Sequence, residues 1–272
     1  VFAMIPQLRK QLEEAVVGPR VLAVANQKGG VGKTTTAINL ATALAACEQR
    51  VLIVDLDPQG NASTGVGIAR EARDLDSYAL IIGEADIVAA TQATVVPNLH
   101  VLPASAHLSG AEIELVGAER REFRLRDALA AAGTRYDYVL IDCPPSLGLL
   151  TLNALVAADA VLVPMQCEFY ALEGLSQLLN TIAAVRTQFN SGLDIQGVVL
   201  TMFDRRNNLA LAVAADVRDH FGDKVYQTVI PRNVRVSEAP SHGRPVLLYD
   251  MNCNGAQAYI HLASEVLKRE RR

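Results

Sequence analysis

Residues 28–35 have the residue types and the spacing of a loop that wraps around the phosphates of a nucleotide. Glycines allow the tight turns that point backbone N–H groups at phosphate oxygens. Lys33 is placed to reach the β- and γ-phosphates, and the Thr34 hydroxyl to coordinate Mg²⁺. The sequence therefore predicts ATP or GTP bound with Mg²⁺, and the phosphate-binding residues are Lys28, Gly29, Gly30, Val31, Gly32, Lys33, Thr34 and Thr35.

The flanks of this loop agree with that prediction, but its first half departs from the usual pattern. The apolar run 21–25 is typical of a buried strand, and 35–44 of a helix. The common pattern has a glycine six residues before the lysine. This chain has Gln27 there, followed by a second cation, Lys28. A glycine-rich turn before a helix-capping threonine is the alternative interpretation.

Three carboxylates follow two further strand-like runs, 51–55 and 138–142. Ligands of parallel sheets bind at the carboxyl ends of the strands. Asp142 is expected to hold the Mg²⁺ shell, with a helix cap as its alternative role. Asp55 and Asp57 should point to opposite sides of an extended segment. We expect Asp57 to orient the attacking water or accept its proton, and Asp55 to support the Mg²⁺ shell or the loop.

The elements that must position these side chains alternate along the chain. Strand-like runs occur at 21–25, 51–55, 99–102, 138–142, 160–163 and 198–201, and helical patterns at 119–132, 146–158, 168–189 and 207–221. Such alternation predicts an α/β fold with a doubly wound, mostly parallel sheet and helices on both faces. We expect a single domain over residues 20–272 and an N-terminal extension over 1–19.

Composition narrows the function classes. Half of the 272 residues are hydrophobic, which is enough for a sizeable core. A net charge of −4 argues against a chain coated with basic residues, so binding to nucleic acid would need a local patch. The four cysteines lack the spacing of a metal or redox pair. With neither a membrane-spanning run nor a signal-peptide pattern, we expect a soluble, cytoplasmic protein.

Five segments together resemble the ParA/Soj family of chromosome- and plasmid-partition ATPases, a branch of the deviant Walker A class of P-loop proteins. The resemblance spans nearly the whole chain after residue 20. The segments are NQKGGVGKTTT at 26–36, DLDPQGN at 55–61, IDCPPSLG at 141–148, QCEFYALEG at 166–174 and PRNVRVSEAPS at 231–241.

The resemblance implies ATP, Mg²⁺ and a sandwich homodimer that forms in the ATP state. Lys28 would be the signature lysine that reaches the partner protomer's nucleotide. Pro231 and Asn233 fall where the family lines its adenine pocket. The implied catalytic residues are Lys28, Lys33 and Asp57, and the implied metal-site residues are Thr34, Asp57 and Asp142.

The resemblance also implies partners. The ATP dimer would bind double-stranded DNA without sequence preference through Arg206 and Arg235, and so associate with the nucleoid. A ParB-type centromere-binding protein would stimulate hydrolysis. A basic strip built from two protomers would make DNA affinity strongly salt-dependent. The alternative reading of these arginines is a solvated charged loop.

Three competing functions fit the sequence less well. A MinD-like membrane switch needs an amphipathic C-terminal helix, but the apolar stripe of the tail, with Tyr259, Leu262 and Val266, is more typical of a helix packed onto a sheet. We therefore expect no membrane partner. A nitrogenase-type reductase partner would need a second cysteine to accompany Cys143. A DNA scaffold with a vestigial nucleotide site does not explain the complete set of Lys33, Thr34, Asp57 and Asp142.

Overall fold

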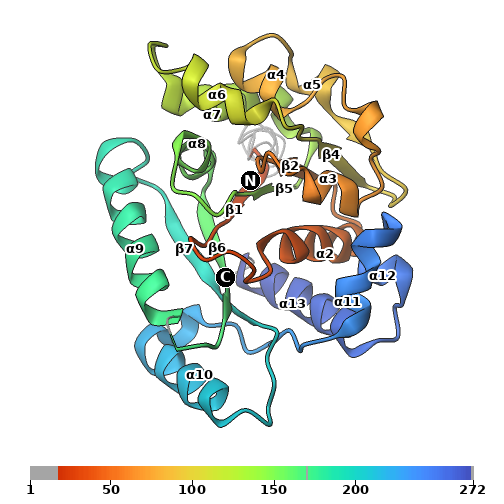
Figure 1. Cartoon of the computed structure of the whole chain (residues 1–272), viewed down its shortest axis with the longest axis vertical. Coiled ribbons are helices and arrows are strands. Elements are labelled where there is room, and N and C mark those ends of the chain that lie inside the picture. Colours follow the sequence, from red (N-terminus) through yellow and green to blue (C-terminus); the bar gives the residue numbers. More distant parts are fainter. Residues whose placement is uncertain (1–17, 170, 271–272) are drawn as a thin grey trace, which may run out of the picture.

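The chain forms a seven-stranded sheet in the computed structural model, which describes residues 18–169 and 171–270 (Figure 1). The order across the sheet is β3-β4-β2-β5-β1-β6-β7, and neighbours pair in parallel except for β3 with β4. The strands are β1 (Arg20–Val24), β2 (Val51–Asp55), β3 (Gln92–Ala93), β4 (Leu99–Leu102), β5 (Tyr138–Asp142), β6 (Ala160–Gln166) and β7 (Asp194–Thr201).

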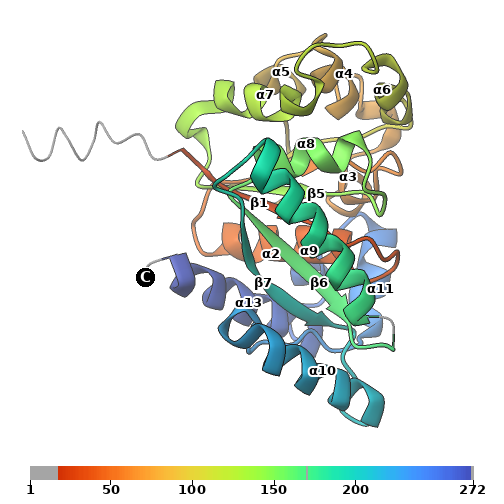
Figure 2. The same ribbon diagram turned by 90° about the vertical axis from the view of Figure 1, so that its left-hand side faces the viewer.

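Helices cover both faces of this sheet, as the sequence predicts. Alternate residues of the central strands point to opposite faces, so each face builds its own apolar core. Leu22 and Val24 of β1 pack with α2 (Lys33–Ala46) and α13 (Asn254–Glu270). Val21 and Ala23 of the same strand pack in the other core, which is covered by α7 (Arg124–Ala132), α8 (Leu149–Ala157), α9 (Ala171–Gln188) and α10 (Asn208–Phe221). In Figure 2 the sheet runs between α8 and α9 on one side and α2 and α13 on the other.

The long helices lie close to the predicted positions, while the short ones escaped prediction. The predicted helices are α2 (Lys33–Ala46), α7 (Arg124–Ala132), α8 (Leu149–Ala157), α9 (Ala171–Gln188), α10 (Asn208–Phe221) and α13 (Asn254–Glu270). The unpredicted ones are α3 (Asn61–Gly65), α4 (Ser77–Ile82), α5 (Ile87–Ala90), α6 (Leu108–Glu114), α11 (Val234–Glu238) and α12 (Val246–Tyr249).

The ends of the chain bear on two predictions. Tyr259, Leu262 and Val266 are buried in the core beneath α13, which packs against α2. No helix within the described ranges combines the length and the apolarity needed to cross a membrane. Residues 1–17 of the predicted N-terminal extension lie outside the described residues, and β1 begins at Arg20.

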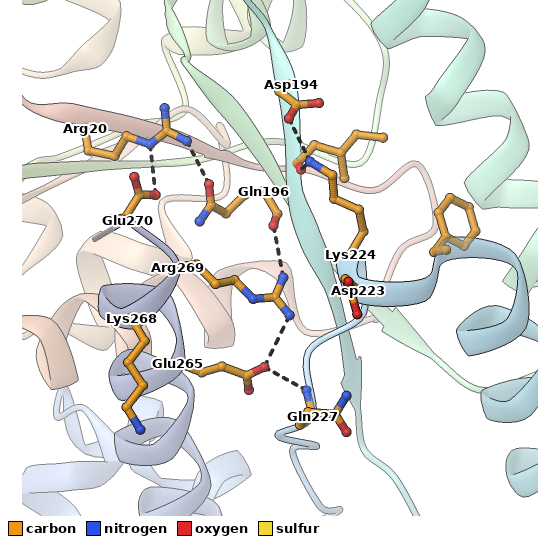
Figure 3. Close-up of a pocket in the computed structure, with 12 residues that line it drawn as sticks. Arg20, Asp194, Gln196, Asp223, Lys224, Gln227, Glu265, Lys268, Arg269 and Glu270 are labelled. Atoms are coloured by element: carbon orange, nitrogen blue, oxygen red, sulfur yellow. Dashed lines mark hydrogen bonds and ion pairs between the residues drawn. The ribbon is translucent and has the colours of Figure 1, made fainter. Parts of the chain in front are cut away.

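A polar cavity of about 670 Å³ lies at the amino end of the sheet, far from the predicted phosphate loop. Charged side chains from β1, β7 and α13 line it and pair with one another (Figure 3). Arg269 donates to the Gln196 carbonyl and to Glu265, while the Glu265 carboxylate accepts from the backbone of Gln227. We assign this network to holding α13 on the sheet, because ligands of such folds bind at the opposite, carboxyl ends of the strands.

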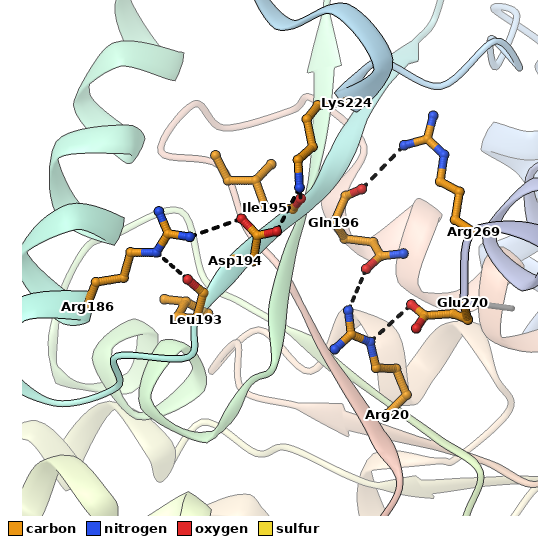
Figure 4. Close-up of polar contacts among 9 residues, drawn as sticks. All are labelled: Arg20, Arg186, Leu193, Asp194, Ile195, Gln196, Lys224, Arg269 and Glu270. Atoms are coloured by element: carbon orange, nitrogen blue, oxygen red, sulfur yellow. Dashed lines mark hydrogen bonds and ion pairs between the residues drawn. The ribbon is translucent and has the colours of Figure 1, made fainter. Parts of the chain in front are cut away.

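The edge strand is fixed by a second part of the same network. Asp194 at the start of β7 lies between Arg186 and Lys224, at 3.0 and 2.7 Å (Figure 4). Arg20 at the start of β1 donates to Gln196 at 2.8 Å and to Glu270 at 3.0 Å. These pairs explain why β7 extends to Asp194, although the sequence predicts its start only at residue 198.

Candidate functional site

The predicted phosphate loop connects the central strand β1 to α2, in the place expected for a nucleotide site. Gly30 and Gly32 have φ of +75° and +86°, a conformation that glycine adopts without strain. Gly32 is the N-cap of α2, and no side chain caps the helix there. The first N–H groups of α2 are therefore available to an anion, as are the positive end of the helix dipole and the loop amides.

Two side chains anchor the loop to the neighbouring strands. Asn26 donates to the carbonyl of Pro164 in β6 at 2.8 Å and accepts from the backbone N–H of Lys28 at 3.1 Å. Thr201, at the carboxyl end of β7, donates its hydroxyl to the carbonyl of Val31 at 2.8 Å. The loop is therefore held at both ends before any ligand binds.

Lys33 is buried inside the loop, with a relative exposure of 7%. Its ammonium donates to the backbone carbonyl of Lys28 at 3.1 Å. Burial lowers the pKa of Lys33, and the charges of Asp142 and Asp57 oppose that shift. The structure therefore brings the predicted phosphate-binding lysine close to both predicted carboxylates.

Asp142 ends β5 and is fully buried beside Asp55, its register partner on β2. Neither carboxylate oxygen of Asp142 has a hydrogen-bond partner of normal geometry within the described part of the chain. Burial raises the pKa of Asp142 well above its usual range, and the Asp55 charge adds to that shift, whereas Thr34 and Lys33 oppose it. A buried carboxylate without a partner next to a threonine hydroxyl fits a Mg²⁺ shell. The alternative role as a helix cap is not observed, because the N-cap of α8 is Gly148.

The protein supplies few oxygen ligands of its own to a metal. Across residues 18–169 and 171–270, no three His, Cys, Asp or Glu side chains are grouped so as to hold a metal ion. Mg²⁺ commonly keeps several waters and binds through one or two protein oxygens together with substrate phosphates. Thr34 and Asp142 therefore suit a magnesium–nucleotide complex rather than a free metal.

Asp55 and Asp57 lie in different surroundings. Asp55 is fully buried and accepts from the Ser63 backbone and hydroxyl, at 2.8 and 2.6 Å, and from the Asp57 backbone at 3.2 Å. Burial raises the pKa of Asp55 to about 6. Asp57 is half-buried, and its carboxylate accepts from the backbone of Gln59 at 2.9 Å. Asp55 thus ties residues 57–63 to the end of β2, whereas Asp57 is partly exposed.

Lys28 forms an ion pair that the sequence analysis missed. Its ammonium contacts the carboxylate of Glu168, in the segment between β6 and α9. Both side chains are half-exposed, at 35% and 46%. Glu168 lies within one of the five family-like segments, which was the available signal, but its pairing across 140 positions of sequence could not be read from a pattern.

Pro231 and Asn233 lie near the carboxyl end of β7. The backbone of Phe203, two residues after β7, forms a parallel bridge with that of Pro231. Asn233 is the N-cap of α11, and its side-chain oxygen accepts from the backbones of Arg235 and Val236, at 2.8 and 3.3 Å. Asn233 therefore has a structural role as the residue that caps α11.

The predicted DNA-contacting arginines lie in different surroundings. Arg206 is 90% exposed and forms two hydrogen bonds with Asp204, at 3.0 and 2.8 Å. It lines a groove of about 570 Å³ together with Arg205, Arg232 and His261. Arg235 lies on α11 and contacts Glu238 at 3.0 Å and Asp250 at 3.6 Å. The structure therefore groups the positive charges around Arg206 and places Arg235 among carboxylates.

Comparisons with known proteins agree with this arrangement. A family model described as an AAA domain matches residues 19–195. The chain is 66% identical to the chromosome partitioning protein ParA of Caulobacter vibrioides over 254 residues, 93% of this chain and 95% of that protein. It is 56% identical to the sporulation initiation inhibitor protein Soj of Bacillus subtilis over 247 residues, 91% and 98% of the two chains.

A solved structure supports the fold. Cobyrinic acid a,c-diamide synthase from Mycobacterium smegmatis, with bound ATP analog and magnesium, matches with a TM-score of 0.82 and 38% identity. The match covers 93% of this chain and 96% of that one.

Proposed function

Because this chain belongs to the ParA/Soj family of partition ATPases, we propose that it hydrolyses ATP to segregate DNA. The observation that carries the proposal is the convergence of Lys33, Thr34, Asp57 and Asp142 at the carboxyl ends of β1, β2 and β5. These residues supply a phosphate-binding cation, a metal-binding hydroxyl and two carboxylates with distinct environments. A vestigial nucleotide site does not explain the presence of all four side chains.

In the proposed mechanism each side chain has one task. Lys33 exchanges its hydrogen bond with the Lys28 carbonyl for a bond with a phosphate oxygen. Thr34 and Asp142 hold a Mg²⁺ ion, which when bound neutralises charge on the phosphates. Asp57 orients the attacking water. Pro231 and Asn233 line the adenine pocket in this proposal.

The proposed dimer gives Lys28 its role. In the ATP state Lys28 leaves Glu168 and reaches the nucleotide of the partner protomer. Gly29 supports close approach of two protomers, because it is exposed and a side chain there would meet no atom within 4 Å in its own protomer. Residues 20–272 act as one ATPase domain in this proposal, with 1–19 as an N-terminal extension.

The proposed partners are double-stranded DNA and a ParB-type protein. Arg206 and Arg235 of both protomers contact phosphates, so the dimer associates with the nucleoid in the cytoplasm and binds DNA without sequence preference. The ParB-type protein stimulates hydrolysis and so releases the dimer. A MinD-like membrane function is less well supported, because burial of Tyr259, Leu262 and Val266 leaves α13 without a free apolar face.

The test is sedimentation of the purified protein in ADP, in ATP and in ATP with nonspecific DNA. We expect a monomer in ADP, a dimer in ATP and co-sedimentation with DNA only in ATP. Lys33→Ala should abolish nucleotide binding and therefore both the dimer in ATP and the co-sedimentation with DNA. Asp57→Ala should bind ATP, dimerise and stay on DNA without turnover. Parental turnover in Asp57→Ala would refute the role of that carboxylate.

A further inference from the structure

Arg73 is a buried cation that the mechanism so far does not use. Its side chain is only 7% exposed in the turn that follows a short 3₁₀ helix (Arg70–Ala72). Its guanidinium donates to four oxygens: the carbonyls of Gly60, Ala104 and Ile68, at 3.2, 2.9 and 2.7 Å, and the hydroxyl of Thr64, at 2.8 Å. None of the ion pairs within the described ranges includes Arg73.

Such a residue is costly to bury without an ion pair. Burial lowers the pKa of Arg73, and the charge of Asp55 opposes that shift. The convergence of acceptors explains how the cation is tolerated, since a planar guanidinium can serve several carbonyl oxygens at once. Stability alone does not explain why a cation occupies this position, because an apolar side chain would avoid the desolvation cost. The location of the acceptors offers a reason.

One of the acceptors belongs to the turn that carries Asp57. The backbone N–H of Gly60 donates to the carbonyl of Asp57 at 2.8 Å, which closes the turn, and the Gly60 carbonyl is one acceptor of Arg73. Gly60 has a φ of +63°, and a Cβ there would lie 2.3 Å from the guanidinium and 2.8 Å from the Ala104 carbonyl. The close approach of three backbone segments therefore depends on glycine at this position.

A second set of hydrogen bonds joins the turn after β2 to the segment after β4. Asp55 accepts from the Asp57 backbone and from Ser63, and the Ser63 hydroxyl accepts from the backbone of Ala104 at 3.0 Å. The segment after β4 is thus tied to the turn after β2 through Arg73 and through Ser63. Asp57 is fixed on its N-terminal side by Asp55 and on its C-terminal side by Arg73.

We propose that Arg73 is a positioning residue for hydrolysis, which holds the turn 57–60 so that the Asp57 carboxylate meets the attacking water. The inference rests on the proposed role of Asp57. In this proposal Arg73 acts through the turn rather than by contact with nucleotide or metal. Because a misplacement of about 1 Å can reduce a rate by about a hundredfold, loosening this turn should slow turnover without weakening nucleotide binding.

The test compares Arg73→Lys with a matched control, Arg70→Lys, on the exposed side of the same turn. An ammonium has three donors on a flexible stem and cannot serve all four of these acceptors at once. We expect Arg73→Lys to lower the kcat for ATP about ten- to a hundredfold, with the dissociation constant for ATP within about twofold of the parent. Arg70→Lys should match the parent in both. Hydrogen exchange of the peptide spanning 57–64 should accelerate only in Arg73→Lys.

A comparison with Asp57→Ala separates positioning from general support. If Arg73 acts through Asp57, Arg73→Lys should keep the ATP-dependent dimer and the DNA co-sedimentation that Asp57→Ala keeps, and lose only turnover. A loss of the ATP-dependent dimer, or an ATP affinity that falls as much as kcat, would overturn the inference. Parental kcat in Arg73→Lys would also overturn it, while leaving the proposed function intact if Asp57→Ala is inactive. Parental turnover in Asp57→Ala would instead refute the proposed function.

A second variant covers the case in which Arg73→Lys does not fold. Thr64 accepts from Arg73 and donates its hydroxyl to the Gly60 carbonyl at 3.0 Å. Thr64→Val keeps the guanidinium and its three carbonyl acceptors but removes this link. We expect kcat to fall about threefold or more with unchanged ATP affinity. Parental kcat in a folded Thr64→Val protein would count against the proposal.

Discussion

Releasing Lys28 from Glu168 should strengthen the ATP-dependent dimer. The ion pair holds the lysine on its own protomer, so it competes with the contact proposed across the interface. Glu168→Gln removes the competing charge while keeping the size of the side chain. Each half-exposed ion pair of this kind contributes up to about 1 kcal/mol. Two pairs must break per dimer, which gives up to about 2 kcal/mol, or a dissociation constant lower by up to about 30-fold.

The assay is sedimentation equilibrium in ATP in the Asp57→Ala background, so that hydrolysis does not drain the dimer. Glu173→Gln is the matched control, because Glu173 is an exposed carboxylate on the first turn of α9. The effect should shrink at high salt, since surface pairs are screened once the Debye length falls to a few ångströms. A dimer that is unchanged or weaker in Glu168→Gln at low salt would refute the idea that this pair restrains Lys28.

The other predictions concern the interface, DNA, the buried network and pH. Gly29→Val should bind ATP as a monomer, because the side chain fits its own protomer but crowds a second one; a dimer in sedimentation would contradict this. Arg206→Ala and Arg235→Ala should each lower the salt slope of DNA binding by about one, equally for all sequences, in fluorescence titrations. Ser63→Ala should lower the free energy of unfolding by about 2–3 kcal/mol, measured in urea, because it removes a hydrogen bond to a buried carboxylate and leaves the Ala104 N–H unpaired. Because the folded-state pKa of Asp55 is raised to about 6, the folded state binds an extra proton below that pH, so the unfolding free energy should fall by about 1–3 kcal/mol as pH rises from about 4 to 6; a flat profile would contradict the assignment.

The sequence predicted the central strands well because their apolar runs are buried on both faces. The predicted bounds of β6 and β7 were too short. The predicted strand ends at Val163, before Pro164, whereas β6 continues to Gln166. Proline is tolerated there because the β1 pairing ends at Leu162, so Pro164 leaves no ladder donor missing on that side. The two-residue β3 is too short to give any periodic signal.

The site was predictable as far as its motifs are local. The loop 28–35 and the carboxylates after β2 and β5 follow from strand ends and glycines. Two contacts were not predictable. Glu168 contacts Lys28 because the connection between β6 and α9 brings it there. Arg73 stands in a polar stretch typical of a surface turn, and its sequence neighbours are exposed. Burial of a single arginine depends on three segments meeting in space, which no spacing in the sequence encodes.

The hydrogen bond from Lys33 to the Lys28 carbonyl has a consequence for selectivity between di- and triphosphates. The loop is already closed around its own lysine, so an arriving nucleotide replaces one acceptor with another and orders little additional chain. Binding to a lone protomer therefore gains almost nothing from loop closure that would favour ATP over ADP. In the proposed cycle, the discrimination between ATP and ADP must come from the second protomer. The concentration of free protomers, rather than the nucleotide affinity of one protomer, therefore determines when the dimer forms.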